Sequence, residues 1–221
     1  MELQRAWHKA FKLPESSNDR TYSSGLWPTG VAAPASDAFL QGLEERWAER
    51  RDAQGCFRKM PPWTYFDIAE AHQWLLLNHA NHVWKTLRWF WDHQASPGLY
   101  TWWEGKGGES FPDWEGVRGW VHPPHVTPHY WTAAEMLLLQ LDMLAYTDGP
   151  IDEPTVVIGA GIPAEWLNQP MHVRGVALPQ GLLDWSWDGR HLHVRIRGST
   201  KLSVQLGSAF PADTPLHIEY L

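Results

Sequence analysis

The chain has 221 residues and a formal net charge of −7, from 18 basic and 25 acidic side chains, which argues against nucleic acid or an anionic membrane surface as a partner. Cys56 is the single cysteine, so an intrachain disulfide and a cysteine-rich zinc module are excluded. No apolar stretch is long enough to cross a membrane, and the polar start lacks the apolar core of a signal peptide, so we expect a cytoplasmic protein.

Helical spacing dominates the first 150 residues. Apolar side chains recur every three or four positions and predict helices over residues 36–51, 64–78, 80–94 and about 127–146. The first two helices are expected to begin on the capping side chains of Ser36 and Thr64, and Asp67 suits the first turn of the second. A tight turn at Asn78 and His79 predicts that the second and third helices form an antiparallel hairpin.

The period of the apolar residues changes to two in the last third of the chain. Alternation over residues 182–187, 192–196, 202–206 and 216–220 predicts strands with one buried face, which carries Leu183, Trp185 and Trp187. Asp188 and Gly189 predict a type I′ hairpin turn. We therefore predict a mainly α protein with a C-terminal antiparallel β-domain, divided into a helical domain of residues 1–150 and a β-domain of residues 151–221.

About thirty residues with little periodicity separate the last two predicted helices. A loop of that length in a compact domain is usually disordered or functional, and its aromatic residues argue against disorder. Carboxylates among indoles suit a carbohydrate site, because indole faces stack on sugar rings and carboxylates perform acid–base chemistry. Glu104 is the first candidate, with Asp113, Glu109 and Glu115 in reserve. Composition alone favours the alternative that the tryptophans fill a core and the acids are solvated.

Three histidines at spacings of three and four, His122, His125 and His129, raise the alternative of a zinc site. The prolines between them prevent a continuous helical face, and no His-Glu-x-x-His pattern accompanies them, so hydrogen-bonded loop histidines are the simpler interpretation. The glycine-rich stretches at 105–108 and 159–161 lack the remaining residues of a phosphate loop or a dinucleotide site. We therefore expect no metal and no cofactor.

Four segments resemble parts of bacterial six-hairpin glycosidases: residues 26–32, 88–105, 133–144 and 159–167. The resemblance implies an (α/α)6 toroid, with twelve helices in six hairpins around a central site, followed by a β-domain. In the α-L-rhamnosidase-like branch a Trp-Glu after the penultimate hairpin carries the general base, and Trp103-Glu104 occupies a similar position. His129-Tyr130 is similar to a His-Tyr pair that lies near the bound sugar in that branch.

The helical part of the chain has room for about half of such a toroid, so the resemblance implies a partial one. The hairpins that would carry the general acid have no counterpart. Asp67 and Glu70 are possible substitutes, but a helix-start acid and a solvated glutamate explain them equally well.

The sequence thus predicts a glycoside hydrolase with a carbohydrate substrate, and the resemblance to the α-L-rhamnosidase-like branch implies that it inverts the anomeric configuration. Its expected catalytic residues are Glu104, Asp113 and Asp67, and its expected sugar-binding residues are Trp102, Trp103, Trp114, His129 and Tyr130. Inversion requires the two carboxyl groups to lie ~6.5–9.5 Å apart. The alternatives are a non-catalytic carbohydrate-binding protein and a structural subunit that works only with another chain.

Half a toroid would leave the flanks of its terminal helices uncovered. The segment around Trp7 and Phe11 and the leucine-rich helix at 130–145 are the candidates for such flanks. Large apolar patches are rarely left on a soluble monomer, and homo-oligomers most often close by two-fold symmetry. We therefore predict a homodimer, in which two half-toroids share a cavity and each supplies Glu104.

Overall fold

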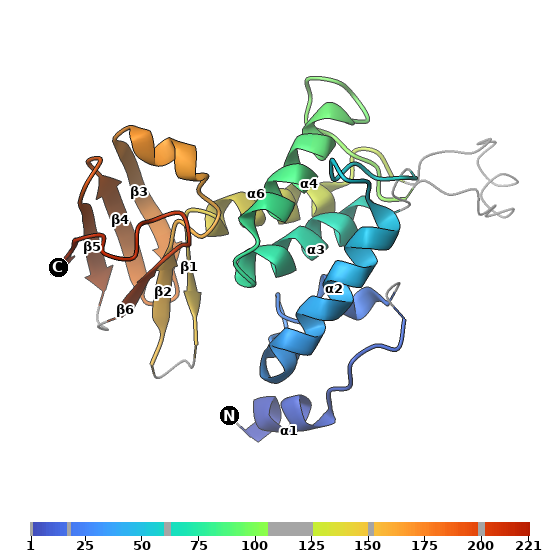
Figure 1. Ribbon diagram of the computed structural model, residues 1–221, viewed down its shortest axis with the longest axis horizontal. Helices are drawn as coiled ribbons and strands as arrows, with labels where there is room; N and C mark the ends of the chain where they lie inside the picture. Colours follow the sequence, from blue (N-terminus) through green and yellow to red (C-terminus); the bar gives the residue numbers. More distant parts are fainter. Residues whose placement is uncertain (1, 17–18, 60–62, 106–125, 150–152, 199–201) are drawn as a thin grey trace, which may run out of the picture. The chain divides into compact units, whose positions relative to one another are not determined.

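The computed structural model describes residues 2–16, 19–59, 63–105, 126–149, 153–198 and 202–221 (Figure 1). The chain divides into a helical unit, Met1–Leu139, and a β unit, Gln140–Leu221. Helices followed by a C-terminal sheet region confirm the coarse fold class. The division falls before residue 150 because strand β1, Ala145–Asp148, pairs with the next strand of the β unit. Within the described ranges, no helix combines the length and the apolar character needed to cross a bilayer.

In the described ranges, the helical unit contains helices α1 to α4 and the first part of α6. Their bounds are Glu2–Ala10 for α1, Ser36–Arg50 for α2, Thr64–Leu76 for α3, Ala80–Asp92 for α4 and Tyr130–Asp142 for α6, and short 3-10 turns span Arg20–Ser23 and Ala33–Ala35. The predicted hairpin of α3 and α4 is confirmed, because the two helices pack together and Asn78 reverses the chain with a φ of 64°. The N–H group of His79 donates to the carbonyl of Trp74 and closes the end of α3.

The prediction that the side chains of Ser36 and Thr64 cap their helices is wrong. Neither α2 nor α3 has a side-chain cap, and Ser36 and Thr64 lie inside their helices. The Thr64 hydroxyl group bonds to Trp103 and Thr132 instead, because tertiary structure brings buried partners to it. Helix α6 is shorter than predicted, since the chain leaves it after Asp142 to enter β1.

Helix α3 lies at the centre of the helical core. Its apolar side chains are buried together with those of α2 and α4, and the fully buried set is Phe39, Leu43, Ile68, Trp74, Leu75, Val83, Leu87 and Phe90. Each such side chain contributes about 1.5–3 kcal/mol when it is removed from water. Helix α3 also buries His72 and Gln73 completely, so it contacts protein on nearly every side rather than along a single apolar stripe.

His82 on α4 is enclosed by two indoles, and this predicts a pH-dependent stability. Its ring stacks on Trp74 with centroids 4.3 Å apart and meets the Trp47 ring edge-on at 4.2 Å. Burial, helped by the positive field of His79, lowers the pKa of His82 from 6.5 to about 4. The unfolded chain therefore takes up a proton at this side chain between pH 6.5 and 4, and the folded chain does not. The resulting stability is complete above pH 6.5 and is lost as the pH falls.

We expect this effect to amount to about 1–2 kcal/mol, less than the full shift implies, because solvent partly screens the ring. Urea denaturation at pH 7 and pH 4.5 measures it. His82→Phe keeps an aromatic ring between the indoles and should lose this part of the pH dependence, whereas His172→Gln, exposed on the β unit, should keep it. An unchanged pH dependence in His82→Phe would contradict the assignment.

The β unit is a sandwich of two sheets. One has the order β1–β2–β6 and the other the order β3–β4–β5–β7. The remaining bounds are Thr155–Ile158 for β2, Met171–Leu178 for β3, Gly181–Trp187 for β4, Leu192–Gly198 for β5, Ser203–Leu206 for β6 and Leu216–Tyr220 for β7. The predicted antiparallel β-domain is confirmed in part: β1–β2, β3–β4 and β4–β5 are antiparallel pairs, whereas β2–β6 and β5–β7 are parallel. Their partners are distant in sequence, so no hairpin turn forces them to be antiparallel.

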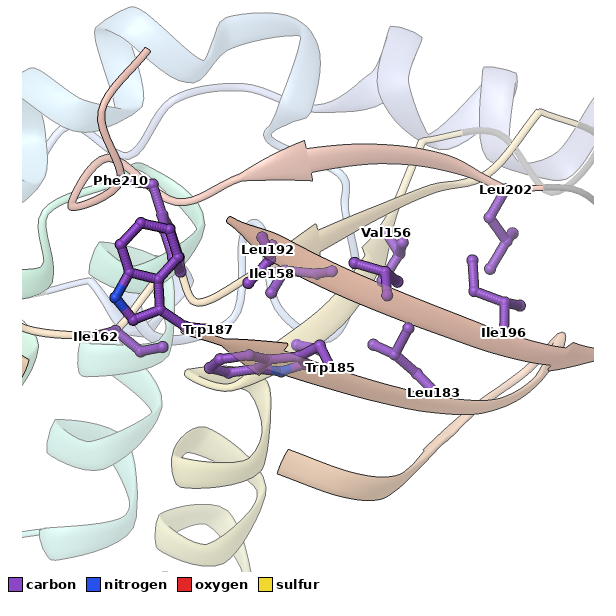
Figure 2. Close-up of a cluster of buried hydrophobic side chains, with 12 residues drawn as sticks. Val156, Ile158, Ile162, Leu183, Trp185, Trp187, Leu192, Ile196, Leu202 and Phe210 are labelled. Atoms are coloured by element: carbon purple, nitrogen blue, oxygen red, sulfur yellow. The ribbon is translucent and has the colours of Figure 1, made fainter. Parts of the chain in front are cut away.

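The core of the β unit lies between the two sheets (Figure 2). Val156 and Ile158 of the first sheet contact a layer that includes Leu183, Trp185 and Trp187 of the second. The alternation along β4 that predicted this buried face is confirmed, since these three side chains are at most 4% exposed. Residues outside the strands, among them Ile162, Leu202 and Phe210, complete the same cluster.

The turn between β4 and β5 differs from the predicted type I′ hairpin. Trp187 pairs with Leu192, so the loop has four residues, and of its first two only Gly189 has a positive φ, of 100°. The Asp188 carboxylate accepts the N–H groups of Arg190 and His191 at 2.8 and 2.7 Å. These bonds, of which that from His191 has the largest effect, lower the pKa of Asp188 to about 2. The carboxylate therefore closes the turn that a second left-handed residue would otherwise have formed.

Candidate functional site

Glu104 lies in an extended segment after α4. The backbone of this segment is hydrogen-bonded to residues at the start of α3 and just before α6. Its carbonyl accepts the N–H group of Thr64 at 3.2 Å, and its own N–H group donates to the carbonyl of Val126 at 3.0 Å. Two positions earlier, the carbonyl of Trp102 accepts the N–H group of His129 at 2.9 Å. The backbone of Glu104 is thus held from both sides, while its side chain is partly exposed.

A chain of hydroxyl groups fixes the orientation and the tautomer of His129. The Thr64 hydroxyl donates to the carbonyl of Trp103, so it must accept from the Thr132 hydroxyl, 2.7 Å away. The Thr132 oxygen then accepts from Nδ1 of His129 at 2.8 Å. Since a neutral imidazole carries one proton, these bonds leave Nε2 of His129 as a hydrogen-bond acceptor.

The electrostatic environment keeps His129 neutral. Burial lowers the pKa of His129, and the negative charge of Glu104 opposes that shift. The influence of Glu104 shows that the carboxylate and the imidazole lie close enough to interact. The structure therefore relates two of the predicted site residues, a partly exposed glutamate and a neutral imidazole whose Nε2 is an acceptor.

The two tryptophans before Glu104 are buried, which bears on their predicted contact with sugar. Trp102 is 2% exposed and Trp103 is 5% exposed. The Trp102 indole N–H donates to the carbonyl of Phe90 at 2.8 Å, which ties the extended segment to the end of α4. These placements favour a structural role for both residues, as the alternative reading of the composition proposed.

Exposed aromatic side chains do occur at the start of α6. Tyr130, a predicted sugar-binding residue, is 76% exposed, and Trp131 is 69% exposed. The Trp131 ring meets Tyr65 of α3 in an edge-on contact with centroids 6.2 Å apart. Sequence reasoning missed Trp131, although its position directly after the His129-Tyr130 pair was a usable signal.

Asp67 lies in a buried cluster of charges rather than in an open site. It is 1% exposed and forms an ion pair with Arg50, which also reaches Glu70 at 3.0 Å. Glu70 accepts in addition from Arg46 at 2.5 Å. Burial raises the pKa of Asp67, and Arg50 opposes that shift. A raised pKa suits a general acid, but a carboxylate enclosed by protein and bound by guanidinium has a structural role as its simplest explanation.

Sequence reasoning missed a second buried pair, which also involves a side chain of α3. His72 Nδ1 lies 2.9 Å from a carboxylate oxygen of Glu135 on α6, and the two side chains are 0% and 5% exposed. Trp27 stacks on the imidazole with centroids 4.4 Å apart. Burial raises the pKa of Tyr65, and the negative charge of Glu135 raises it further. Glu135 therefore acts on the ring that contacts exposed Trp131.

Several predicted residues lie outside the described residues. These are the catalytic candidate Asp113, the sugar-binding candidate Trp114, the reserves Glu109 and Glu115, and the histidines His122 and His125. Among the residues that the structure does describe, no group of three or more His, Cys, Asp or Glu side chains has the arrangement of a metal site.

Comparison of the chain with protein-family models, with curated proteins and with solved structures finds no match. A function for this chain therefore depends on the chemistry of the described side chains and on the resemblance carried by its motifs.

Proposed function

We propose that this chain is a glycoside hydrolase, or the C-terminal half of one, in which Glu104 is the general base. The observation that carries the proposal is the side chain of Glu104, which is partly exposed on a backbone held from both sides and whose charge acts on the pKa of His129. A catalytic base needs that combination of a fixed position and access to water.

In the proposed reaction Glu104 accepts a proton from water, and the water oxygen forms a bond to the anomeric carbon. The bond from that carbon to the leaving oxygen breaks, and a general acid protonates the leaving oxygen. Nε2 of His129 accepts a hydrogen bond from a sugar hydroxyl group. The exposed rings of Tyr130 and Trp131 offer apolar faces for stacking on the sugar. Attack from the side opposite the leaving group inverts the anomeric configuration.

The proposed architecture is half of an (α/α)6 toroid, and it does not supply the general acid from α3. Asp67 is engaged by Arg50, so we assign the acid to Asp113 or to a second chain. This leaves a specific second candidate, a non-catalytic carbohydrate-binding protein. The buried placement of Asp67 favours it, because the described residues then offer one accessible carboxylate at this site instead of two.

A panel of aryl glycosides separates these two functions. We expect the full chain to release the aryl group from at least one member, and the new reducing end to appear with inverted configuration by NMR. Turnover of no member, together with saturable binding of a sugar, would replace hydrolysis with carbohydrate binding. Neither turnover nor sugar binding would remove both candidates.

The exposed apolar face of α6 leads to a prediction about assembly. Three of its leucines are exposed by 42–58%: Leu137, Leu138 and Leu141. Because such a face is rarely left in water, we propose that a second copy of the chain covers it, as expected for two half-toroids that share a cavity. Light scattering at micromolar concentration should give a dimer.

A charge on this face should separate the dimer. Leu137→Glu places a carboxylate in the proposed contact and is expected to give a folded monomer. Leu99→Glu is the matched control, because Leu99 is 70% exposed on a loop outside α6. A monomeric wild-type chain, or a Leu137→Glu variant that stays dimeric, would contradict this mode of assembly.

A further inference from the structure

A hollow of about 450 Å³ lies on the sheet β3–β4–β5–β7 of the β unit. All four strands contribute polar side chains to it, among them His172, Ser186, His193 and His217. These four residues form one row across the sheet, since His172 pairs with Ser186, Ser186 with His193, and His193 with His217. The three histidines therefore project from the same face.

Three imidazoles gather at the β5–β7 end of this row. The His193 and His217 rings stack with centroids 5.0 Å apart and an interplanar angle of 15°. His191 stands two positions before His193, and its ring centroid is 5.8 Å from that of His217 and 6.4 Å from that of His193. Two residues at this spacing in an extended chain face the same side, and the parallel pairing with β7 adds the third ring.

Two of the acidic side chains around the three rings are paired with arginines, and a third faces the imidazoles. Glu219 on β7 and Asp184 on β4 are paired with Arg195 at 2.7 Å and with Arg197 at 3.0 Å. Asp188 instead faces the imidazoles, with one oxygen 3.2 Å from Nδ1 of His191 and 3.9 Å from Nε2 of His193. The cluster thus combines exposed imidazoles with a carboxylate, and imidazole and carboxylate are common ligands of transition metals.

We propose that His193 and His217 form a surface site for a divalent transition metal ion of the Cu²⁺, Ni²⁺ and Zn²⁺ class. As the rings stand, no group of three such side chains in the described ranges is arranged to hold a metal, so the site is a two-imidazole one completed by water. His193 is 53% exposed, and a tilt of its ring out of the stack would bring its nitrogen and that of His217 to one ion.

The test uses the full chain and the metal chlorides alone. Calorimetric titration with Ni²⁺ or Zn²⁺ should show binding that falls by roughly tenfold or more in His193→Asn and in His217→Asn, since loss of a ligand costs at least as much as loss of an outer partner. The electron paramagnetic resonance spectrum of bound Cu²⁺ should show coupling to imidazole nitrogens that these substitutions remove.

His172→Asn is the matched control, because His172 lies on the same face of the sheet but at the β3 end of the row. It should leave metal affinity unchanged. Since the chain contains 12 histidines, the informative quantity is the difference from the double variant His193→Asn/His217→Asn. Unchanged binding in the double variant, an equal loss in His172→Asn, or no binding by the wild-type chain would each overturn the proposal.

Discussion

Glu70→Ala is expected to destabilise the helical unit by about 3–5 kcal/mol, the effect of removing one partner from a buried ion pair. Glu70 is 2% exposed and accepts hydrogen bonds from Arg46 at 2.5 Å and from Arg50 at 3.0 Å. Buried Arg51 belongs to the same neighbourhood, where burial lowers its pKa to about 10. Without Glu70, Arg46 would lose its ion pair with that carboxylate, and Asp67 would be left to balance the charges of Arg50 and Arg51.

Urea denaturation followed by tryptophan fluorescence measures this loss. The β unit has its own core, so the analysis must allow for two transitions, and the loss is expected in the helical one. Glu44→Ala on the exposed side of α2 is the matched control and should change stability by no more than about 0.5 kcal/mol. Glu70→Gln should fall between these two, since an amide keeps the size and an acceptor but not the charge. A Glu70→Ala variant as stable as Glu44→Ala would mean that the ion cluster does not hold α2 to α3.

The elements with a strong local period could be predicted from the sequence. The buried face of β4 was predicted correctly, because a period of two leaves one choice once a core is assumed. The parallel partners of β5 and β2 could not be predicted, since β7 and β6 are joined to them by long segments that impose no direction. Thr64 shows a different limit, because a hydroxyl at a predicted helix start fits a cap until its tertiary partners are known.

Within the candidate site, the sequence identified residues by their type and motif, but it did not predict their burial or their partners. Glu104 and His129 were singled out by motif, and the charge of Glu104 acts on the pKa of His129. Asp67 fitted the role of a first-turn acid, but its ion pair with Arg50 depends on the packing of α2 against α3, which no local pattern reveals. In the sequence, Trp102 could equally stack on a sugar or belong to the core. Its hydrogen bond to the carbonyl of Phe90 favours the core.

Glu104→Gln is the substitution with the largest expected effect on activity. If Glu104 is the base that activates water, the amide keeps the shape and loses the proton acceptor, which should lower kcat by roughly 10²–10⁴-fold. The substrate is the aryl glycoside that the wild-type chain turns over best. Stability should change little, because the structural bonds of Glu104 are made by its backbone N–H and carbonyl groups, which the substitution keeps.

The control must separate loss of the base from disturbance of the fold. Asp92→Asn serves this purpose, since Asp92 is an exposed carboxylate at the end of α4, the helix to which Trp102 is tied. Loss of a general base can be recognised by chemical rescue. A small nucleophilic anion such as azide should restore turnover in Glu104→Gln, because an anion attacks the anomeric carbon without prior deprotonation. Azide should not restore turnover in a variant that lacks the general acid. Full activity in Glu104→Gln would remove Glu104 from the mechanism, and loss of activity with an equal loss of folded protein would assign it a structural role.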